Sequence, residues 1–327
     1  MTFKANWEKT HSKVHLPGEL MRKMLGTYYV HENEIKSISI IEGGCANINV
    51  LVHFNSSSKD PVILRIYLRD NKSAYIEQKV STLLCGELPV PRFYHIAEAF
   101  GYVFAIMEYL PGATLRDLLL SDQQIDIKKV MFKVGEVLGI ISSSNFSNSG
   151  FFNKNLEIKE SLSRESLVDF CEGVLTDGKV KAIIPVTQRE QITTLFNTYK
   201  RLLPDGTEKN LVHADFDPAN ILVTKNNDEI DITGIIDWEF SFSGSSLWDV
   251  ANMLRYAYQM PKAYQDSFLK GLSSTGHQLP DSWQITVNLL NIMSLLDCLK
   301  RSDVNSRPNQ TKDIKMLISH ILYDLKK

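Results

Sequence analysis

The sequence predicts an α+β fold of two lobes, a small antiparallel-sheet lobe followed by a larger and mainly helical lobe. The first hundred residues alternate short runs rich in Val, Ile and Leu with turn residues, which is the pattern of strands. The later residues instead show apolar positions at helical spacing. The change falls at residues 108–112, which end in Pro-Gly and favour a hinge. We therefore place an amino-terminal lobe over residues 1–108 and a carboxy-terminal lobe over residues 109–327.

The amino-terminal lobe is expected to hold four strands and one helix. The strand runs are bounded by Gly, Asn, Ser or Pro, and they cover residues 38–41, 48–54, 62–68 and 102–107. Residues 74–84 carry an apolar stripe with a helical period, and the Pro-Val-Pro at 89–91 ends it. Residues 42–47 (E-G-G-C-A-N) join the first two strands and are typical of a hairpin tip.

The carboxy-terminal lobe is expected to be helical, with one short sheet inside it. Helical spacing is found over residues 114–120, 128–142, 190–203, 249–258, 283–299 and 312–323. Strand-like runs at 211–213, 221–223 and 230–236 surround a polar turn at 226–228. Two lobes joined at one crossing leave a cleft between them, and such clefts are common binding sites.

Composition narrows the class of protein. The 327 residues carry a formal net charge of −2 and no basic stripe, so we expect no nucleic-acid partner. The four cysteines form no C-x-x-C pair, which argues against a zinc ribbon or a redox dithiol. Apolar runs are too short to span a bilayer, and residues 1–13 lack the apolar region of a secretory signal. We therefore expect a cytoplasmic protein without a membrane partner; the pattern predicts no particular oligomeric state.

The strongest functional signal is the segment H-A-D-F-D-P-A-N at residues 213–220, which has the H-x-D-x-x-x-x-N spacing of a kinase catalytic loop. Further on, G-I-I-D-W-E at 234–239 places Asp237 at the end of an apolar strand. Phosphoryl transfer needs an aligned hydroxyl and neutralised phosphate charge more than covalent help. We predict that Asp215 orients an acceptor hydroxyl and takes its proton. Asn220 and Asp237 are then the predicted oxygen ligands of Mg2+.

These motifs resemble those of the aminoglycoside phosphotransferase and choline kinase family, which has a protein-kinase-like fold. The family reads H-G-D-x-x-x-x-N and then I-D-W-E or I-D-F, and the resemblance extends over about residues 38–250. It implies an ATP- and Mg2+-dependent kinase that phosphorylates a hydroxyl of a small molecule, such as an antibiotic, an amino alcohol or a sugar. The segment S-L-W-D-V-A at 246–251 resembles the family's downstream helix start, whose Asp, here Asp249, is structural. None of these motifs identifies the acceptor.

The same resemblance implies an ATP site in the amino-terminal lobe and the hinge. The hinge residues that would line the adenine site are Met107, Glu108, Tyr109 and Leu110. The phosphate side would be formed by Gly43, Gly44 and Asn47 of the hairpin tip, and by Arg65 with its helix partner Glu77. Arg65 departs from the lysine that protein kinases carry there, although some members of the resembling family have Arg.

Several of these residues also have a purely structural interpretation. Gly43-Gly44 could be only a hairpin turn, and Arg65 with Glu77 could be solvated surface charges. We expect His213 to brace the catalytic loop by hydrogen bonding. Acidic residues near the acceptor side suggest a cationic substrate, although they could equally be a solvated face; they are Asp217, Glu239, Asp169 and Glu172. The rival functional hypothesis is a pseudokinase or nucleotide-binding regulatory module.

Overall fold

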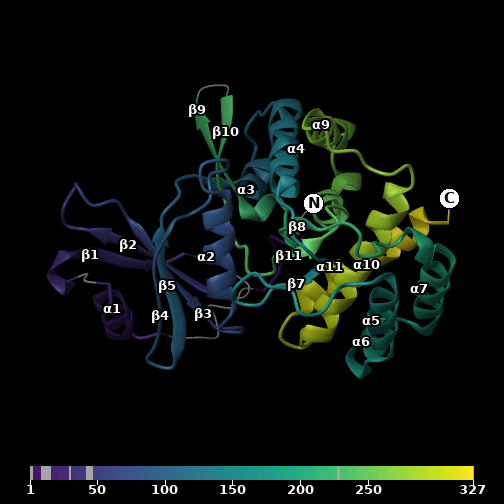
Figure 1. Cartoon of the computed structure of the whole chain (residues 1–327), viewed down its shortest axis with the longest axis horizontal. Helices are drawn as coiled ribbons and strands as arrows, with labels where there is room; N and C mark the ends of the chain where they lie inside the picture. The colour runs from purple at the N-terminus through teal and green to yellow at the C-terminus, as the bar shows by residue number, and fades with distance from the viewer. Residues whose placement is uncertain (1–2, 9–15, 29–30, 42–46, 227–228, 327) are drawn as a thin grey trace.

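The computed structural model describes residues 3–8, 16–28, 31–41, 47–226 and 229–326. It has the predicted bilobal α+β fold: a sheet-rich lobe, on the left in Figure 1, and a larger helical lobe on the right. No helix in these described ranges is long and apolar enough to cross a membrane.

The amino-terminal lobe is built on one five-stranded antiparallel sheet. In sheet order its strands are β1 (Ile35–Ile40), β2 (Ile48–Phe54), β3 (Val62–Tyr67), β5 (Tyr102–Glu108) and β4 (Phe93–Ala99). The helix α1 (Gly18–Gly26) packs Met21, Met24 and Leu25 with the residues of one face, and α2 (Ser73–Leu84) contacts β4 and β5. Arg65 lies in β3, in register with Asn49 of β2 and Ala105 of β5. The sheet thereby fixes Arg65 at the centre of the lobe.

The carboxy-terminal lobe is an assembly of helices. They are α3 (Leu115–Leu120), α4 (Ile127–Ser143), α5 (Arg164–Thr176), α6 (Gly178–Ile183), α7 (Val186–Tyr199), α8 (Leu247–Leu254), α9 (Lys262–Ser274), α10 (Trp283–Arg301) and α11 (Pro308–Asp324). Short 3-10 turns are η1 (Glu32–Glu34) in the smaller lobe and η2 (Lys200–Leu202), η3 (Pro218–Asn220) and η4 (Ala257–Gln259) in the larger. The chain that joins the two lobes is hydrogen-bonded to the larger lobe, because Thr233 Oγ1 donates to the Pro111 carbonyl at 2.6 Å.

Two three-stranded sheets in this lobe carry the predicted functional loops. One has the order β10 (Glu229–Ile235), β9 (Ile221–Asn226), β6 (Ala113–Thr114), and the other β7 (Gly150–Phe151), β11 (Phe242–Gly244), β8 (Asn210–Val212). The segment from 213 to 220 therefore connects β8 to β9, and Asp237 follows β10 directly. Because β9 and β10 are paired, the two predicted functional segments lie side by side.

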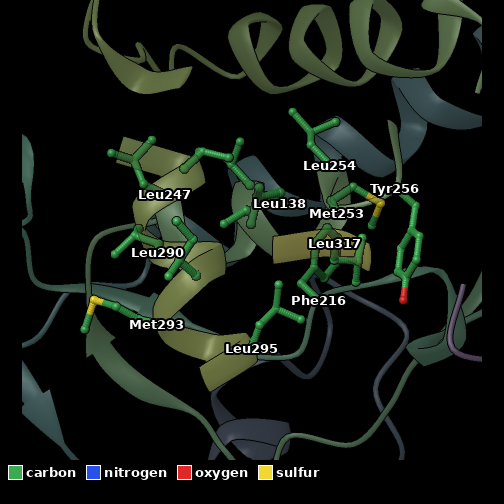
Figure 2. Close-up of a cluster of buried hydrophobic side chains, with 14 of the residues drawn as sticks. Leu138, Phe216, Leu247, Met253, Leu254, Tyr256, Leu290, Met293, Leu295 and Leu317 are labelled. Atoms are coloured by element: carbon green, nitrogen blue, oxygen red, sulfur yellow. The ribbon is translucent and has the colours of Figure 1, made fainter. Parts of the chain in front are cut away.

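A hydrophobic core holds the segment 213–220 against the helices. Figure 2 shows Phe216 among side chains from α8, α10 and α11, and Phe216 is fully buried. Asp215 and Asp217 are its sequence neighbours, so burial of this ring fixes the backbone between the two carboxylates. Removing such a ring from water stabilises the fold by roughly 1.5–3 kcal/mol.

Helices α4 and α9 approach closely because glycines face each other. A Cβ built on Gly135 would lie 2.1 Å from the Phe268 carbonyl oxygen, and one built on Gly271 would lie 2.0 Å from that of Phe132. Both contacts are with backbone atoms, which cannot swing aside. This crossing needs glycine on both helices.

The first described residues, 3–8, pack on the larger lobe and not on the sheet they precede. Phe3 and Trp7 belong to the core of the helical lobe, and in Figure 1 the N-terminus lies beside it. The division at residue 108 stays a prediction. Residues 3–8 contribute to the core of the larger lobe, although in the chain they precede the sheet of the smaller lobe.

The expected strands are found with shifts of a few residues at their ends, while several elements were not expected from the sequence. These are α1, β4, β6, β7, β11, α5, α6 and α9, and the described part of the larger lobe holds two short sheets where one was expected. The helix expected over 249–258 is interrupted: α8 ends at Leu254, and η4 follows. The helix expected over 190–203 begins earlier, at Val186, and ends in the turn η2.

Candidate active site

The loop from 213 to 220 is held by a buried carboxylate on α8. Asp249 Oδ2 accepts the backbone N–H of His213 at 2.8 Å, and Oδ1 accepts that of Ala214 at 2.8 Å. Asp249 is fully buried. Ala214 has φ 68°, a left-handed conformation that non-glycine residues rarely adopt. The two hydrogen bonds stabilise this turn and aim the next residue, Asp215, away from the core.

The His213 ring braces the loop, as predicted. Its Nε2 lies 3.0 Å from the Ile236 carbonyl oxygen, so Nε2 carries the proton and donates. Its Nδ1 then accepts the Asp215 N–H at 3.3 Å. Burial lowers the pKa of His213. The ring is therefore neutral, and both nitrogens are used to connect the catalytic loop to the end of β10.

Asp215 and Asn220 are in direct contact. Asn220 Nδ2 donates to Asp215 Oδ2 at 3.0 Å and to the Asp215 carbonyl at 2.8 Å. The Asp215 side chain keeps 29% of its surface exposed, so a ligand can reach it. Asp215 and Asn220 are five residues apart, and the turn η3, which ends at Asn220, brings their side chains together.

Asp237 is placed beside them by the backbone. The N–H of Ile236 donates to the Asn220 carbonyl at 3.0 Å, and Asp237 follows with φ 70°, again left-handed for a non-glycine residue. Its side chain also keeps 29% exposure. The three oxygen-bearing side chains predicted to act together, Asp215, Asn220 and Asp237, therefore come from adjacent backbone segments.

Arg65 connects the two lobes at this point. Its Nη2 donates to Glu77 Oε1 at 2.8 Å and to Asp237 Oδ1 at 2.5 Å. Tyr67 donates its hydroxyl to the other oxygen of Glu77 at 2.6 Å. Arg65 and Glu77 are buried, so they are not a solvated surface pair. Burial disfavours the Arg65 cation, but Glu77 and Asp237 outweigh it and raise the pKa of Arg65 further.

Asn47 and Glu239 form a second connection between the lobes. Asn47 Nδ2 donates to Glu239 Oε2 at 2.9 Å, and both side chains are buried. Burial and the nearby Asp237 carboxylate raise the pKa of Glu239 to about 8. Both effects favour the protonated form of Glu239. The glycines predicted to cover phosphates, Gly43 and Gly44, lie outside the described residues.

The hinge residues lie at the end of β5 and directly after it. Met107 and Glu108 end the strand, and Glu108 accepts the Arg92 N–H at 3.1 Å. Tyr109 and Leu110 come next, and Gly112 has φ 135°, where a Cβ would lie 2.7 Å from the Val223 carbonyl oxygen. Only glycine fits that turn. The hinge thus rests on β9.

Lys4 is the site residue that the sequence did not predict. Its Nζ lies 2.8 Å from Asp215 Oδ1 and also forms an ion pair with Asp217. Both partners of Lys4 are more than 200 positions away, and nothing in the polar start of the chain indicates such a contact. The other acids considered for a cationic substrate, Asp169 and Glu172, lie exposed on α5.

The residues present fit Mg2+ and a polar nucleotide. Within the described residues no three His, Cys, Asp or Glu side chains group as a metal site. Mg2+ binds through one or two carboxylates together with substrate phosphates, and Asp237 offers a partly exposed carboxylate. The hydrogen bonds of Asn220 described above use its amide nitrogen, so its Oδ1 is suited to a cation. Arg65 Nε and Glu239 Oε1 are buried and have no partner in the described part of the chain, as expected beside a polar ligand.

Comparisons with known proteins agree with this fold. The family model described as "Phosphotransferase enzyme family" matches residues 37–284. A thermostable mutant of aminoglycoside phosphotransferase APH(4)-Ia, in ternary complex with ADP and hygromycin B, is 19% identical, with a TM-score of 0.68 over 92% of this chain and 97% of that one. Macrolide 2'-phosphotransferase MphH from Brachybacterium faecium is 14% identical, with a TM-score of 0.65 over 92% and 97%. Choline kinase LicA from Streptococcus pneumoniae is 13% identical, with a TM-score of 0.59 over 95% and 100%. A search of curated proteins found no match.

Proposed function

The chain belongs to the phosphotransferase enzyme family, and we propose that it is an ATP- and Mg2+-dependent kinase that phosphorylates a hydroxyl of a small molecule. The observation that carries the proposal is the junction of Asp215, Asn220 and Asp237, held by backbone hydrogen bonds where the two lobes meet. The ADP and AMP-PNP complexes of similar structures support a nucleotide as the phosphate donor.

The roles of the side chains follow from their chemistry. Asp215 accepts the proton of the acceptor hydroxyl, because its carboxylate is ionised and reachable. Asn220 and Asp237 hold Mg2+, which when bound neutralises phosphate charge. Arg65, kept in place by Glu77, supplies positive charge on the phosphate side. His213 and Asp249 position the loop and take no part in proton transfer.

The adenine end of the nucleotide is assigned to the hinge. Met107 and Glu108 at the end of β5, with Tyr109 and Leu110 after them, lead into the larger lobe, so a ring bound there would contact both lobes. Asn47, with Gly43 and Gly44, is assigned to the phosphate side. Because Asn47 contacts Glu239 and Arg65 contacts Asp237, movements of the smaller lobe are coupled to the metal ligands.

The acceptor is a hydroxyl-bearing small molecule, and neither a nucleic acid nor a membrane is proposed as a partner. Similar structures include kinases named for an aminoglycoside, a macrolide, choline and aminopropanol. Asp217 and Glu239 were candidates for binding a substrate cation. Each has an internal partner, Lys4 and Asn47 respectively, so a cationic substrate would have to compete for them. Cytoplasmic location stays a prediction.

The test is ADP release from Mg-ATP with a panel of acceptors. The panel contains aminoglycosides, macrolides, choline, aminopropanol, homoserine and methylthioribose. Acceptor-dependent release is expected for one class, and Asp215→Asn should remove nearly all of it while nucleotide binding persists. Asp231→Asn, which alters an exposed acid of β10, is the matched control and should leave turnover unchanged. Nucleotide binding that is absent in the wild type would refute the proposal.

A second candidate is a nucleotide-binding module without turnover. The observation in its favour is the 2.5 Å contact between Arg65 and Asp237, since the guanidinium occupies an oxygen assigned to the metal. The two candidates differ in one readout. A module would bind nucleotide in a Mg2+-dependent way and release no ADP with any acceptor, and Arg65→Lys would not create turnover.

A further inference from the structure

Residues 3–8 are anchored to the larger lobe on both sides of Lys4. Phe3 is 3% exposed and packs on the rings of Tyr256 and Tyr264, with centroids 5.3 and 6.2 Å away. Trp7 is 8% exposed, and its Nε1 donates to Asp313 Oδ2 at 2.8 Å. These contacts resemble those of the core, so the backbone of Lys4 has a fixed place.

Two further contacts complete the anchor. Glu8 accepts the backbone N–H groups of Asn309 and Gln310, at 2.8 and 3.3 Å, at the start of α11. A carboxylate at a helix N-terminus is stabilised by the unpaired N–H groups there. Asp313, which binds Trp7, also accepts the hydroxyl of Tyr256 at 2.6 Å. In Figure 2 the Tyr256 hydroxyl points out of the core cluster.

The Lys4 ammonium bridges two carboxylates of the catalytic loop. Asp215 and Asp217 are two residues apart, and Asp217 is 7% exposed. Two carboxylates so close repel each other unless a cation lies between them. Arg255 is the other cation nearby, but its guanidinium is held by Asn252, Asn291 and Ser294. Lys4 is thus the cation that directly contacts both acids.

We propose that Lys4 is a positioning residue of the phosphotransfer site, whose ammonium orients the Asp215 carboxylate toward the acceptor hydroxyl. The proposal rests on the proposed function and adds a residue to it. Asp215 is held by two donors, Lys4 Nζ on Oδ1 and Asn220 Nδ2 on Oδ2. Each carboxylate oxygen has two lone pairs, so the two donors fix the plane of the group and leave one acceptor position on each oxygen.

The chemical step leaves Lys4 unchanged. The acceptor oxygen attacks the terminal phosphorus of ATP, its proton passes to Asp215, and the bond from that phosphorus to the leaving oxygen breaks to release ADP. The ammonium keeps its proton throughout, and its charge stands beside the acceptor oxygen. Burial disfavours the Lys4 ammonium, but Asp215 and Asp217 outweigh burial and raise its pKa above the ordinary value.

The opposite interpretation is that residues 3–8 form an inhibitory plug over Asp215. Release of a plug would expose the rings of Phe3 and Trp7 and break the contacts of Glu8 with α11. Burial of these aromatic side chains contributes several kcal/mol, at roughly 1.5–3 kcal/mol per large apolar side chain. The two interpretations predict opposite changes in turnover when the ammonium is removed.

The experiment compares Lys4→Met, Lys4→Arg and Lys4→Ala in the full chain. ADP release from Mg-ATP is measured with the acceptor identified by the panel, or with water if no acceptor accelerates it. We expect Lys4→Met to lower kcat on the order of 100-fold, the loss typical of a misplaced catalytic group, with the KM for ATP unchanged. Lys4→Arg should retain more of kcat. Added n-propylammonium, which replaces the missing atoms, should restore part of kcat in Lys4→Ala.

The control is Lys133→Met, which removes another lysine that pairs with an aspartate, Asp231, far from the loop. It should leave kcat unchanged. Rescue by n-propylammonium separates loss of the cation from loss of folding, since a misfolded chain would not recover. Wild-type kcat in Lys4→Met would overturn the proposal, and a raised kcat would overturn it in favour of the plug. A wild type that turns over neither an acceptor nor water would refute the proposed function first.

Discussion

Replacing Asp249 by alanine should destabilise the larger lobe and disorder the loop that carries Asp215. Asp249 is fully buried and accepts the N–H groups of His213 and Ala214, both at 2.8 Å. Alanine offers neither oxygen, and the His213 donor is buried. Ala214 would then keep a left-handed φ of 68° without the bonds that stabilise it.

The expected loss can be worked from these contacts. A buried donor left without its acceptor costs about 1–3 kcal/mol, so two of them predict a loss of about 2–6 kcal/mol in the free energy of unfolding. Asp249→Asn keeps one acceptor oxygen and should lose about half as much. Turnover should fall as well, because Asp215 is the next residue after Ala214.

Urea denaturation followed by tryptophan fluorescence measures the loss. Trp238 is a local reporter, since its ring centroid lies 4.3 Å from that of His213. Asp231→Ala is the matched control, because its ion pair with Lys133 is half-exposed and exposed pairs contribute at most about 1 kcal/mol. If Asp249→Ala loses no more than this control, Asp249 does not hold the loop, and the argument from its two hydrogen bonds is wrong.

Three other substitutions or probes test separate parts of the structure. Gly271→Ala should lower the free energy of unfolding by about 1–3 kcal/mol, because its Cβ would meet the Phe132 carbonyl. The control is Gly173→Ala on α5, which has open space around it and should not destabilise. Equal melting temperatures of the two variants would contradict the close crossing. Arg65→Met should cost about 3–5 kcal/mol by leaving Glu77 buried without its cation, and Arg65→Met combined with Glu77→Gln should recover part of this in thermal denaturation. Burial raises the pKa of the Cys171 thiol to about 12, so Cys171 should resist iodoacetamide at pH 8 in the native state, while the exposed Cys85 reacts. Equal labelling of the two cysteines, measured by mass spectrometry, would show that α5 opens.

The parts of the fold that sequence predicted are those with strong local signals. Strands β2 and β3 are continuous runs of branched residues between turn residues, and both were located within a residue or two. The helix α9 was missed because its buried residues, Tyr264, Phe268 and Leu272, are diluted by polar residues and by Gly271. That glycine weakens helical propensity, but the crossing with α4 requires it. Tertiary contact overrode the local signal there.

The proximity of Asp215 and Asn220 was predictable because their spacing is set by one local turn. Asp215 and Asn220 are joined across five residues by η3, so a short motif specifies their contact. Lys4 could not be found this way, because its contact with Asp215 spans 211 positions and depends on the anchors Phe3 and Trp7. A lysine in a polar segment is usually solvated, and nothing local distinguishes this one.

Lys4, Ala214 and Asp237 of the site all have left-handed backbone although none is glycine, and the last two explain why a local rule fails where the chemistry is proposed. Each costs of order 1–3 kcal/mol of strain and persists only when surrounding contacts determine it. Asp249 supplies those contacts for Ala214, and the bonds of Ile236 to Asn220 and His213 supply them before Asp237. The same hydrogen bonds bring the loop 213–220 and the end of β10 together, with the carboxylates of Asp215 and Asp237 directed away from the core. A relaxed backbone would satisfy local preference and separate Asp215 from Asp237, so the strain and the proposed site depend on the same few hydrogen bonds.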